Sequence, residues 1–153
     1  MEKGTKLPAF ALPDESGEER TVGDLAGPRG LVLYAYPKDD TPGCTIEAQD
    51  FRDRREEIRR AGFTVAGISM DDARSHCSFR DKYELTFPLL TDADGSFLRS
   101  IGAYGEKTLY GRKMEGVLRS TVVVDPEGTV LAHYPNVRAK GHADRVVADL
   151  EKL

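Results

Sequence analysis

The sequence predicts a mixed α/β fold in which a central sheet is flanked by helices. Two apolar segments, residues 31–36 and 63–69, are each followed by a helical pattern, which is typical of parallel strands joined by right-handed crossovers. A β-rich segment at 117–124 and a second one at 129–134 enclose a turn signal, so a hairpin adds antiparallel strands. The sequence contains no repeat and no linker-like stretch, and we therefore expect residues 1–153 to form a single domain.

The first strand is predicted at Leu31–Tyr36 because this run is continuously apolar, which indicates burial on both faces. It ends at Pro37, since proline cannot donate to a strand ladder. Thr41 and Pro42 predict a helix start, because threonine is a common N-cap residue and proline is favoured at the first helical position. An apolar stripe at helical spacing continues this helix to about Gly62.

The remaining elements follow from similar signals. The residues before the first strand are rich in proline and glycine and are predicted as loops. Further along the chain, apolar strands alternate with helices, which is the element order of the thioredoxin type of fold. The predicted ranges are strand 63–69, helix 72–85, extended segment 86–90, helix 96–101, strands 117–124 and 129–134, and helix 142–153.

Composition and charge argue against several classes of protein. With 22 Lys and Arg against 26 Asp and Glu, the formal net charge is -4, so no nucleic-acid partner is expected. The longest apolar run, 31–36, is far shorter than the roughly 20 residues of a spanning helix, and the N-terminus lacks the apolar core of a secretory signal. We therefore expect a cytoplasmic protein with reduced thiols and no membrane partner.

The chain contains two cysteines, Cys44 and Cys77, and three histidines. Two cysteines cannot make a disulfide framework, and His76, His133 and His142 have no spacing typical of metal ligands. The sequence therefore predicts neither a metal site nor another cofactor, and it indicates that the cysteines serve chemistry rather than architecture.

Cys44 falls in the first turn of the helix that follows the first strand. At that position the unpaired backbone N–H groups and the positive end of the helix dipole stabilise a thiolate, which is the nucleophilic form of cysteine. Cys44 also lies on the same apolar stripe as Phe51 and Ile58, so a small buried residue without chemistry is the alternative interpretation.

The residues around Cys44 resemble a known family. The segment 37–45 contains the PxxxTxxC pattern of peroxiredoxins, and the longer stretch 36–53 resembles their bacterioferritin-comigratory (PrxQ) branch. The segment 117–125 is similar to the strand of that branch that carries the active-site arginine, and 87–92 and 7–10 are similar too. The resemblance covers essentially the whole chain. It implies a thioredoxin-like fold with the peroxiredoxin elaboration, and reduction of hydrogen peroxide and small alkyl hydroperoxides.

The resemblance also implies roles for single residues. Cys44 would be the peroxidatic nucleophile, which attacks the peroxide and becomes a sulfenic acid. Arg119 would stabilise the thiolate and hold the peroxide oxygens with its fork of donors; a partly exposed charge in a strand is the alternative. Thr41 would cap the helix and direct its hydroxyl to the sulfur or the substrate, or cap alone. Pro37 would shield the pocket from water, and the Cys44 N–H would bind the developing negative oxygen.

Many members of this branch carry a resolving cysteine five residues after the peroxidatic one, where this chain has Gln49. Cys77 is the other candidate. Steps of about 100° per residue place Phe79 and Tyr83 on the core face of its helix and Cys77 on the polar side, where the thiol is accessible. Some relatives place their resolving cysteine in this later helix. The resemblance thus implies a disulfide between Cys44 and Cys77, with a bystander thiol in a one-cysteine enzyme as the alternative.

A disulfide needs Cα atoms within about 7 Å, so we expect local unfolding of one or both cysteine helices during turnover. Thioredoxin or a similar dithiol would reduce the disulfide, and by analogy with the branch the protein is expected to be a monomer. A thiol–disulfide oxidoreductase on the same fold is disfavoured, because Cys44 and Cys77 do not form a C-x-x-C pair. A redox sensor or binding module that uses Cys44 without turnover is an alternative that the sequence leaves open.

Overall fold

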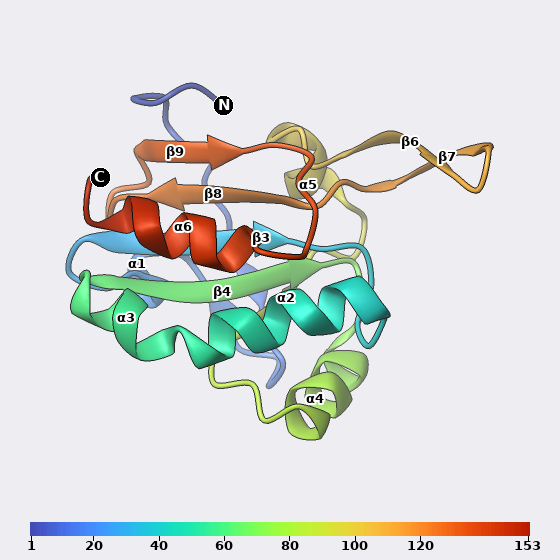
Figure 1. The fold of residues 1–153 in the computed structure, drawn as a ribbon, viewed down its shortest axis with the longest axis horizontal. Helices are drawn as coiled ribbons and strands as arrows, with labels where there is room; N and C mark the ends of the chain where they lie inside the picture. The colour runs from blue at the N-terminus through green and yellow to red at the C-terminus, as the bar shows by residue number, and fades with distance from the viewer.

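A five-stranded mixed sheet forms the centre of the computed structural model, which describes residues 1–153 except for the side chain of Leu109 (Figure 1). The strand order is β5-β4-β3-β8-β9. Strands β3, β4 and β5 run parallel, while β8 pairs antiparallel with both β3 and β9, which confirms the predicted mixed sheet. The strands are β3 (Gly30–Ala35), β4 (Phe63–Ser69), β5 (Leu89–Thr91), β8 (Ser120–Val124) and β9 (Val130–Tyr134).

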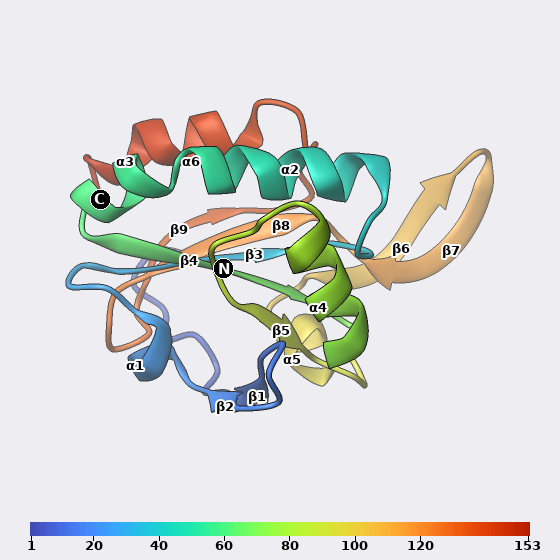
Figure 2. The ribbon, with the colours of Figure 1, turned by 90° about the horizontal axis from the view of Figure 1, so that it is seen from below.

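Helices cover both faces of this sheet (Figure 2). On one face lie α2 (Pro42–Asp53), α3 (Arg55–Arg60) and α6 (His142–Leu150); on the other lie α1 (Val22–Leu25) and α5 (Ser96–Ser100). Helix α4 (Ala73–Lys82) lies alongside the sheet, near the N-terminal half of α2 in both views. None of the described helices is both long and apolar enough to span a lipid bilayer.

Strand β3 is buried on both faces, as its continuous apolar run predicts. Val32 and Tyr34 belong to the core cluster under α2 and α6, whereas Leu31 and Leu33 belong to the cluster on the opposite face. This central strand therefore holds both layers together, and the chain leaves it directly toward α2.

The sequence predicted one continuous helix from Thr41 to about Gly62. That prediction is wrong, because the helix is interrupted at Arg54. Arg54 has φ −95° and ψ 6° and separates α2 from α3. Its side chain turns away to pair with Asp144 at 2.8 Å and Glu57 at 3.0 Å. The break bends the chain between α2 and α3 (Figure 1), and α3 leads into β4.

The sequence prediction missed the hairpin formed by β6 (Tyr104–Leu109) and β7 (Arg112–Val117), which projects from the body of the protein (Figures 1 and 2). Most of β7 is exposed, and half of its residues are charged, so the hairpin lacks the apolar alternation that marks a half-buried strand. Its two-residue turn has positive φ at both Tyr110 and Gly111, the backbone of a type I′ turn. Strands β1 (Leu12–Pro13) and β2 (Glu19–Arg20), together with α1, likewise lie in the segment predicted as loops.

Candidate active site

Cys44 lies in the first turn of α2 and is only 1% exposed. Helix α2 starts as predicted, with Thr41 at the N-cap and Pro42 at the first helical position. The thiol sulfur accepts a hydrogen bond from Nη2 of Arg119 at 3.2 Å. The predicted helix-terminal cysteine is therefore also in contact with a cation that lies 75 positions away in the sequence.

Arg119 occupies the two-residue connection between β7 and β8, so the prediction of one β-rich run over 117–124 is wrong at this point. Because Arg119 lies outside both strands, its carbonyl is free to accept a hydrogen bond from the Val137 N–H at 2.8 Å. The Arg119 side chain is 14% exposed; its Nη1 donates to Glu47 Oε1 at 2.7 Å and its Nη2 donates to Cys44. Both arms of the fork are thus used, which a lysine could not reproduce.

Glu47 is a site residue that the sequence analysis missed. It lies one turn after Cys44, is fully buried, and its Oε2 atom has no hydrogen-bond partner. Burial raises the pKa of this carboxyl to about 7, although the charge of Arg119 opposes the rise. The available signal was an acidic residue between Cys44 and Ala48, on the apolar stripe of α2, where a charge is expected only with a partner.

Burial lowers the pKa of Arg119, but the negative charges of Glu47 and Cys44 more than compensate, so the net shift is upward. Arg119 therefore stays protonated beside the sulfur. Gly43 leaves the space for it, because a Cβ at this position would lie 3.2 Å from Arg119 Nη2 and 3.7 Å from the Ala139 side chain.

Thr41 does not cap the helix through its side chain, so that prediction is wrong. Its hydroxyl instead donates to the carbonyl of Lys38 at 2.9 Å, closing the loop before α2. The N–H groups of the first helical turn consequently have no side-chain cap, and such groups bind anions well. Pro37 follows directly after β3 and Tyr36 and is partly buried.

Cys77 lies on the exposed side of α4, as its helical position predicts, while Phe79 and His76 on the opposite side are buried. Its thiol donates to the main-chain carbonyl of Glu15 at 3.0 Å. The structure therefore does not bring Cys77 to Cys44: both cysteines are free, and each sulfur has a different partner.

The histidines have structural partners. His142 Nε2 lies 2.7 Å from the Thr121 hydroxyl, and burial lowers its pKa to about 4. His76 comes close to Asp39 and Asp71, a grouping that linear spacing did not reveal, with ligand-type atoms within 4.8 Å of one another. The His76 and Asp39 atoms are hydrogen-bonded to each other, and Asp71 accepts from the Asp39 N–H and from Ser69, so the group is an internal network.

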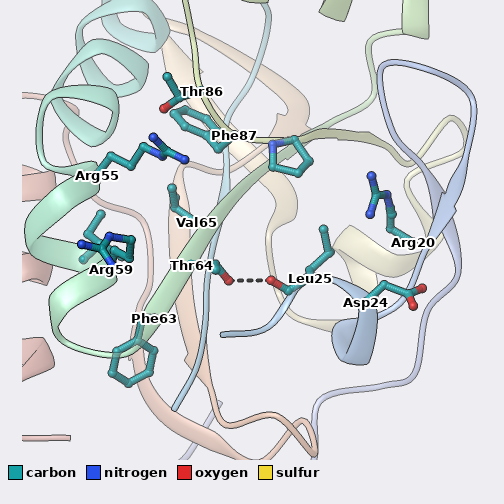
Figure 3. Close-up of a pocket in the computed structure, with 12 residues that line it drawn as sticks. Arg20, Asp24, Leu25, Arg55, Arg59, Phe63, Thr64, Val65, Thr86 and Phe87 are labelled. Atoms are coloured by element: carbon teal, nitrogen blue, oxygen red, sulfur yellow. Dashed lines mark hydrogen bonds between the residues drawn. The ribbon is translucent and has the colours of Figure 1, made fainter. Parts of the chain in front are cut away.

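A cavity of about 220 Å³ lies away from both cysteines (Figure 3). Its walls come from α3, the first half of β4, α1 and the segment before β5, with Arg55 and Arg20 on opposite sides. Thr64 donates to the Leu25 carbonyl at its floor. Among the described residues that line this cavity, none is one of the predicted site residues.

The chain matches a known protein family over most of its length. Residues 3–133 match the family model described as the AhpC/TSA family. A peroxiredoxin candidate of Mycobacterium tuberculosis is 46% identical over 147 residues, which cover 96% of this chain and 93% of that protein. The peroxiredoxin Bcp of Xanthomonas campestris is 41% identical over 150 residues, covering 95% of this chain and 93% of that protein. The chain belongs to the peroxiredoxins, in the bacterioferritin-comigratory (PrxQ) branch.

Solved structures of this branch share the fold of this peroxiredoxin. A variant of the PrxQ of Xylella fastidiosa superposes with a TM-score of 0.90 at 32% identity, covering 99% of this chain and 96% of that one. The bacterioferritin comigratory protein of Xanthomonas campestris gives 0.85 at 38% identity, covering 94% and 90%. The fold is thus thioredoxin-like, and the protein is a peroxidase that uses peroxide and a thiol reductant.

Proposed function

We propose that this peroxiredoxin reduces hydrogen peroxide and small alkyl hydroperoxides with Cys44 as its nucleophile. The observation that carries the proposal is the geometry of the Arg119 guanidinium. Its Nη2 donates to the Cys44 sulfur at 3.2 Å, and its Nη1 donates to Glu47 at 2.7 Å. A cation fixed in this way stabilises the thiolate and stays in position as negative charge develops on the peroxide.

The first step is a displacement at oxygen. The Cys44 thiolate attacks the terminal oxygen of the peroxide, an S–O bond forms and the O–O bond breaks. The sulfur is oxidised to a sulfenic acid, and the leaving oxygen takes a proton to become water or an alcohol. Arg119 and the uncapped N–H groups of the first turn of α2 are placed to bind the leaving oxygen while it carries charge.

We propose that Cys77 resolves the sulfenic acid. Its thiol would attack the Cys44 sulfur, so that an S–S bond forms and the S–O bond breaks, releasing water. An external dithiol such as thioredoxin would then supply two electrons and restore both thiols. The exposure of Cys77 and the presence of glutamine at position 49 support this role. Because the two sulfurs have separate partners, part of α2 or α4 must unfold locally for the bond to form.

The proposed substrate range rests on similarity to relatives. The Xanthomonas campestris relative is described for its alkyl peroxide reduction activity. We further propose that residues 1–153 act as one domain and as a cytoplasmic monomer, in keeping with one central sheet and two free cysteines. Light scattering after size exclusion would give the mass that tests the monomer.

Non-reducing mass spectrometry of tryptic peptides after stoichiometric peroxide tests the mechanism. A Cys44–Cys77 linkage that is absent from the Cys77→Ser variant is the expected result. Sulfinic acid on Cys44 with Cys77 still free would instead show a one-cysteine enzyme that depends on an external thiol. Turnover with thioredoxin present separates the enzyme from a sensor, because a sensor consumes about one peroxide per chain. Cys44→Ser is expected to be inactive in both assays.

A further inference from the structure

A buried side-chain network joins the loop before α2 to helix α4. Asp39, in that loop, is nearly buried, and His76, which directly precedes Cys77, is fully buried. The His76 Nδ1 atom lies 2.8 Å from Asp39 Oδ2, while Nε2 donates to the carbonyl of Leu90 at 3.0 Å. Both ring nitrogens are therefore occupied, and the ring is fixed between the loop and β5.

Asp39 has further partners on both sides of this contact. The Tyr36 hydroxyl donates to its Oδ1 at 2.6 Å, and the Ser75 hydroxyl donates to its Oδ2 at 2.8 Å. Its own N–H donates to the carboxylate of Asp71 at 3.0 Å. We call the contacts of the Asp39 carboxylate with Tyr36, Ser75 and His76 the Asp39 junction. Buried, charge-assisted hydrogen bonds of this kind are costly to break.

Asp40 makes a second, weaker connection to the other end of α4. Its carboxylate accepts from Lys82 at 2.8 Å and from the Tyr83 hydroxyl at 2.7 Å. Asp40 and Lys82 are exposed, and exposed ion pairs contribute little to stability. Two consecutive aspartates thus hold the loop against the beginning and the end of α4, and the buried Asp39 junction is the stronger connection.

The position of this junction relates it to the reacting cysteines. Asp39 is linked to Cys44 by a short run of loop and first helical turn, and His76 is adjacent to Cys77 in the chain. We propose that Asp39 and His76 are positioning residues, which hold the peroxide-reactive conformation together and limit the rate at which Cys77 reaches oxidised Cys44. This inference rests on the proposed two-cysteine function.

The junction then sets the balance between two fates of the sulfenic acid. In one, the Cys77 thiol displaces the hydroxyl from sulfur as water and the disulfide forms. In the other, the sulfenic sulfur attacks a second peroxide and its O–O bond breaks. One oxygen is transferred to the sulfur, the other leaves as water or an alcohol, and sulfinic acid results. A tight junction delays the first reaction, so more of the protein is lost to the second.

Two variants weaken the junction to different degrees. Asp39→Asn removes the charge from its centre, and Ser75→Ala removes one peripheral hydrogen bond with little risk to folding. Ser78→Ala, on the exposed side of the same helix, is the matched control. Val130→Ala, a core truncation in the cluster on the other face of the sheet, controls for a general loss of stability.

Rapid quenching with acid, alkylation and mass spectrometry would follow both oxidation steps after a pulse of hydrogen peroxide. We expect Ser75→Ala to speed disulfide formation about fivefold and Asp39→Asn by about tenfold or more, with less sulfinic acid. The rate of sulfenic acid formation should stay within about twofold, and both controls should keep the wild-type disulfide rate. Unchanged disulfide rates in folded Ser75→Ala and Asp39→Asn, or an equal acceleration in Val130→Ala, would overturn the proposal.

Hydrogen exchange of the reduced protein tests the junction independently of the disulfide. We expect peptides covering residues 42–47 and 73–77 to exchange faster by similar factors in Ser75→Ala and Asp39→Asn. If exchange accelerates but the wild-type protein forms no disulfide, the junction stands and the role proposed for Cys77 fails. If exchange in both segments is unchanged, the junction proposal fails whatever the disulfide result.

Discussion

Replacing Glu47 by glutamine removes a carboxyl that is costly to ionise, so we expect it to change how stability depends on pH. The carboxyl accepts from Arg119, and its pKa rises from 4.5 to about 7 in the folded chain because it is buried. Between these values the folded state binds more protons than the unfolded state, so stability falls as pH rises and is constant above about 7. At 1.36 kcal/mol per pKa unit, the loss amounts to roughly 3 kcal/mol.

Urea denaturation of wild type and Glu47→Gln across this pH range would measure the effect. The free energy of unfolding of the variant, relative to wild type, should rise by roughly 3 kcal/mol from pH 4.5 to above 7, because contributions from all other groups cancel in the difference. In Arg119→Gln the decline in stability should continue above pH 7, since Arg119 lowers the pKa of Glu47. Parallel curves for wild type and Glu47→Gln would refute the reasoning.

Three further predictions concern the surroundings of the thiol. Arg119→Lys should slow the reaction of Cys44 with peroxide about 100-fold in quenched-alkylation kinetics, since a single ammonium nitrogen cannot reproduce the planar two-nitrogen fork. A change below about threefold would contradict this. Tyr34→Phe removes a buried hydroxyl without a hydrogen-bond partner among the described residues and should leave the free energy of unfolding unchanged or raised. Tyr36→Phe loses the hydrogen bond to Asp39 and should lower the free energy of unfolding by about 2 kcal/mol. Urea titrations that give the reverse order would contradict these hydrogen-bond assignments. Gly43→Ala should slow peroxide reduction about tenfold by displacing the Arg119 guanidinium, while the free energy of unfolding rises by up to about 1 kcal/mol. Wild-type kinetics in this variant would show that the guanidinium accommodates the added methyl group at 3.2 Å without losing its position.

The sequence predicted the elements whose burial leaves a clear pattern. Strand β3 is continuously apolar and β4 is mostly so, and the helical position of Cys77 opposite the core face correctly indicated its exposure. The β6–β7 hairpin has little buried surface and therefore no such pattern, so it was missed. At the break, Arg54 pairs with Asp144 in the last helix, and a local sequence pattern cannot show such a contact.

The same distinction applies to the active site. Cys44 was found because its placement depends on adjacent residues, a strand end and a helix start. The partnership of Arg119 with Glu47 depends on the pairing of β3 with β8, and its geometry could be seen only in the structure. Thr41 occupies the N-cap as predicted, but its hydroxyl is oriented toward the Lys38 carbonyl in the loop, and no rule of local sequence predicts that orientation.

The distance in sequence between Cys44 and Arg119 also has a consequence for biosynthesis. The two residues are 75 positions apart and meet only after β8 has paired with β3. At a synthesis rate of about 5–20 residues per second, the cysteine leaves the ribosome several seconds before its guanidinium partner. During that interval the thiol lacks the cation that stabilises its reactive form. In the proposed mechanism, the peroxide reactivity of Cys44 is therefore acquired late, as the central sheet closes, and a nascent chain would be spared the oxidation to which the finished protein is exposed.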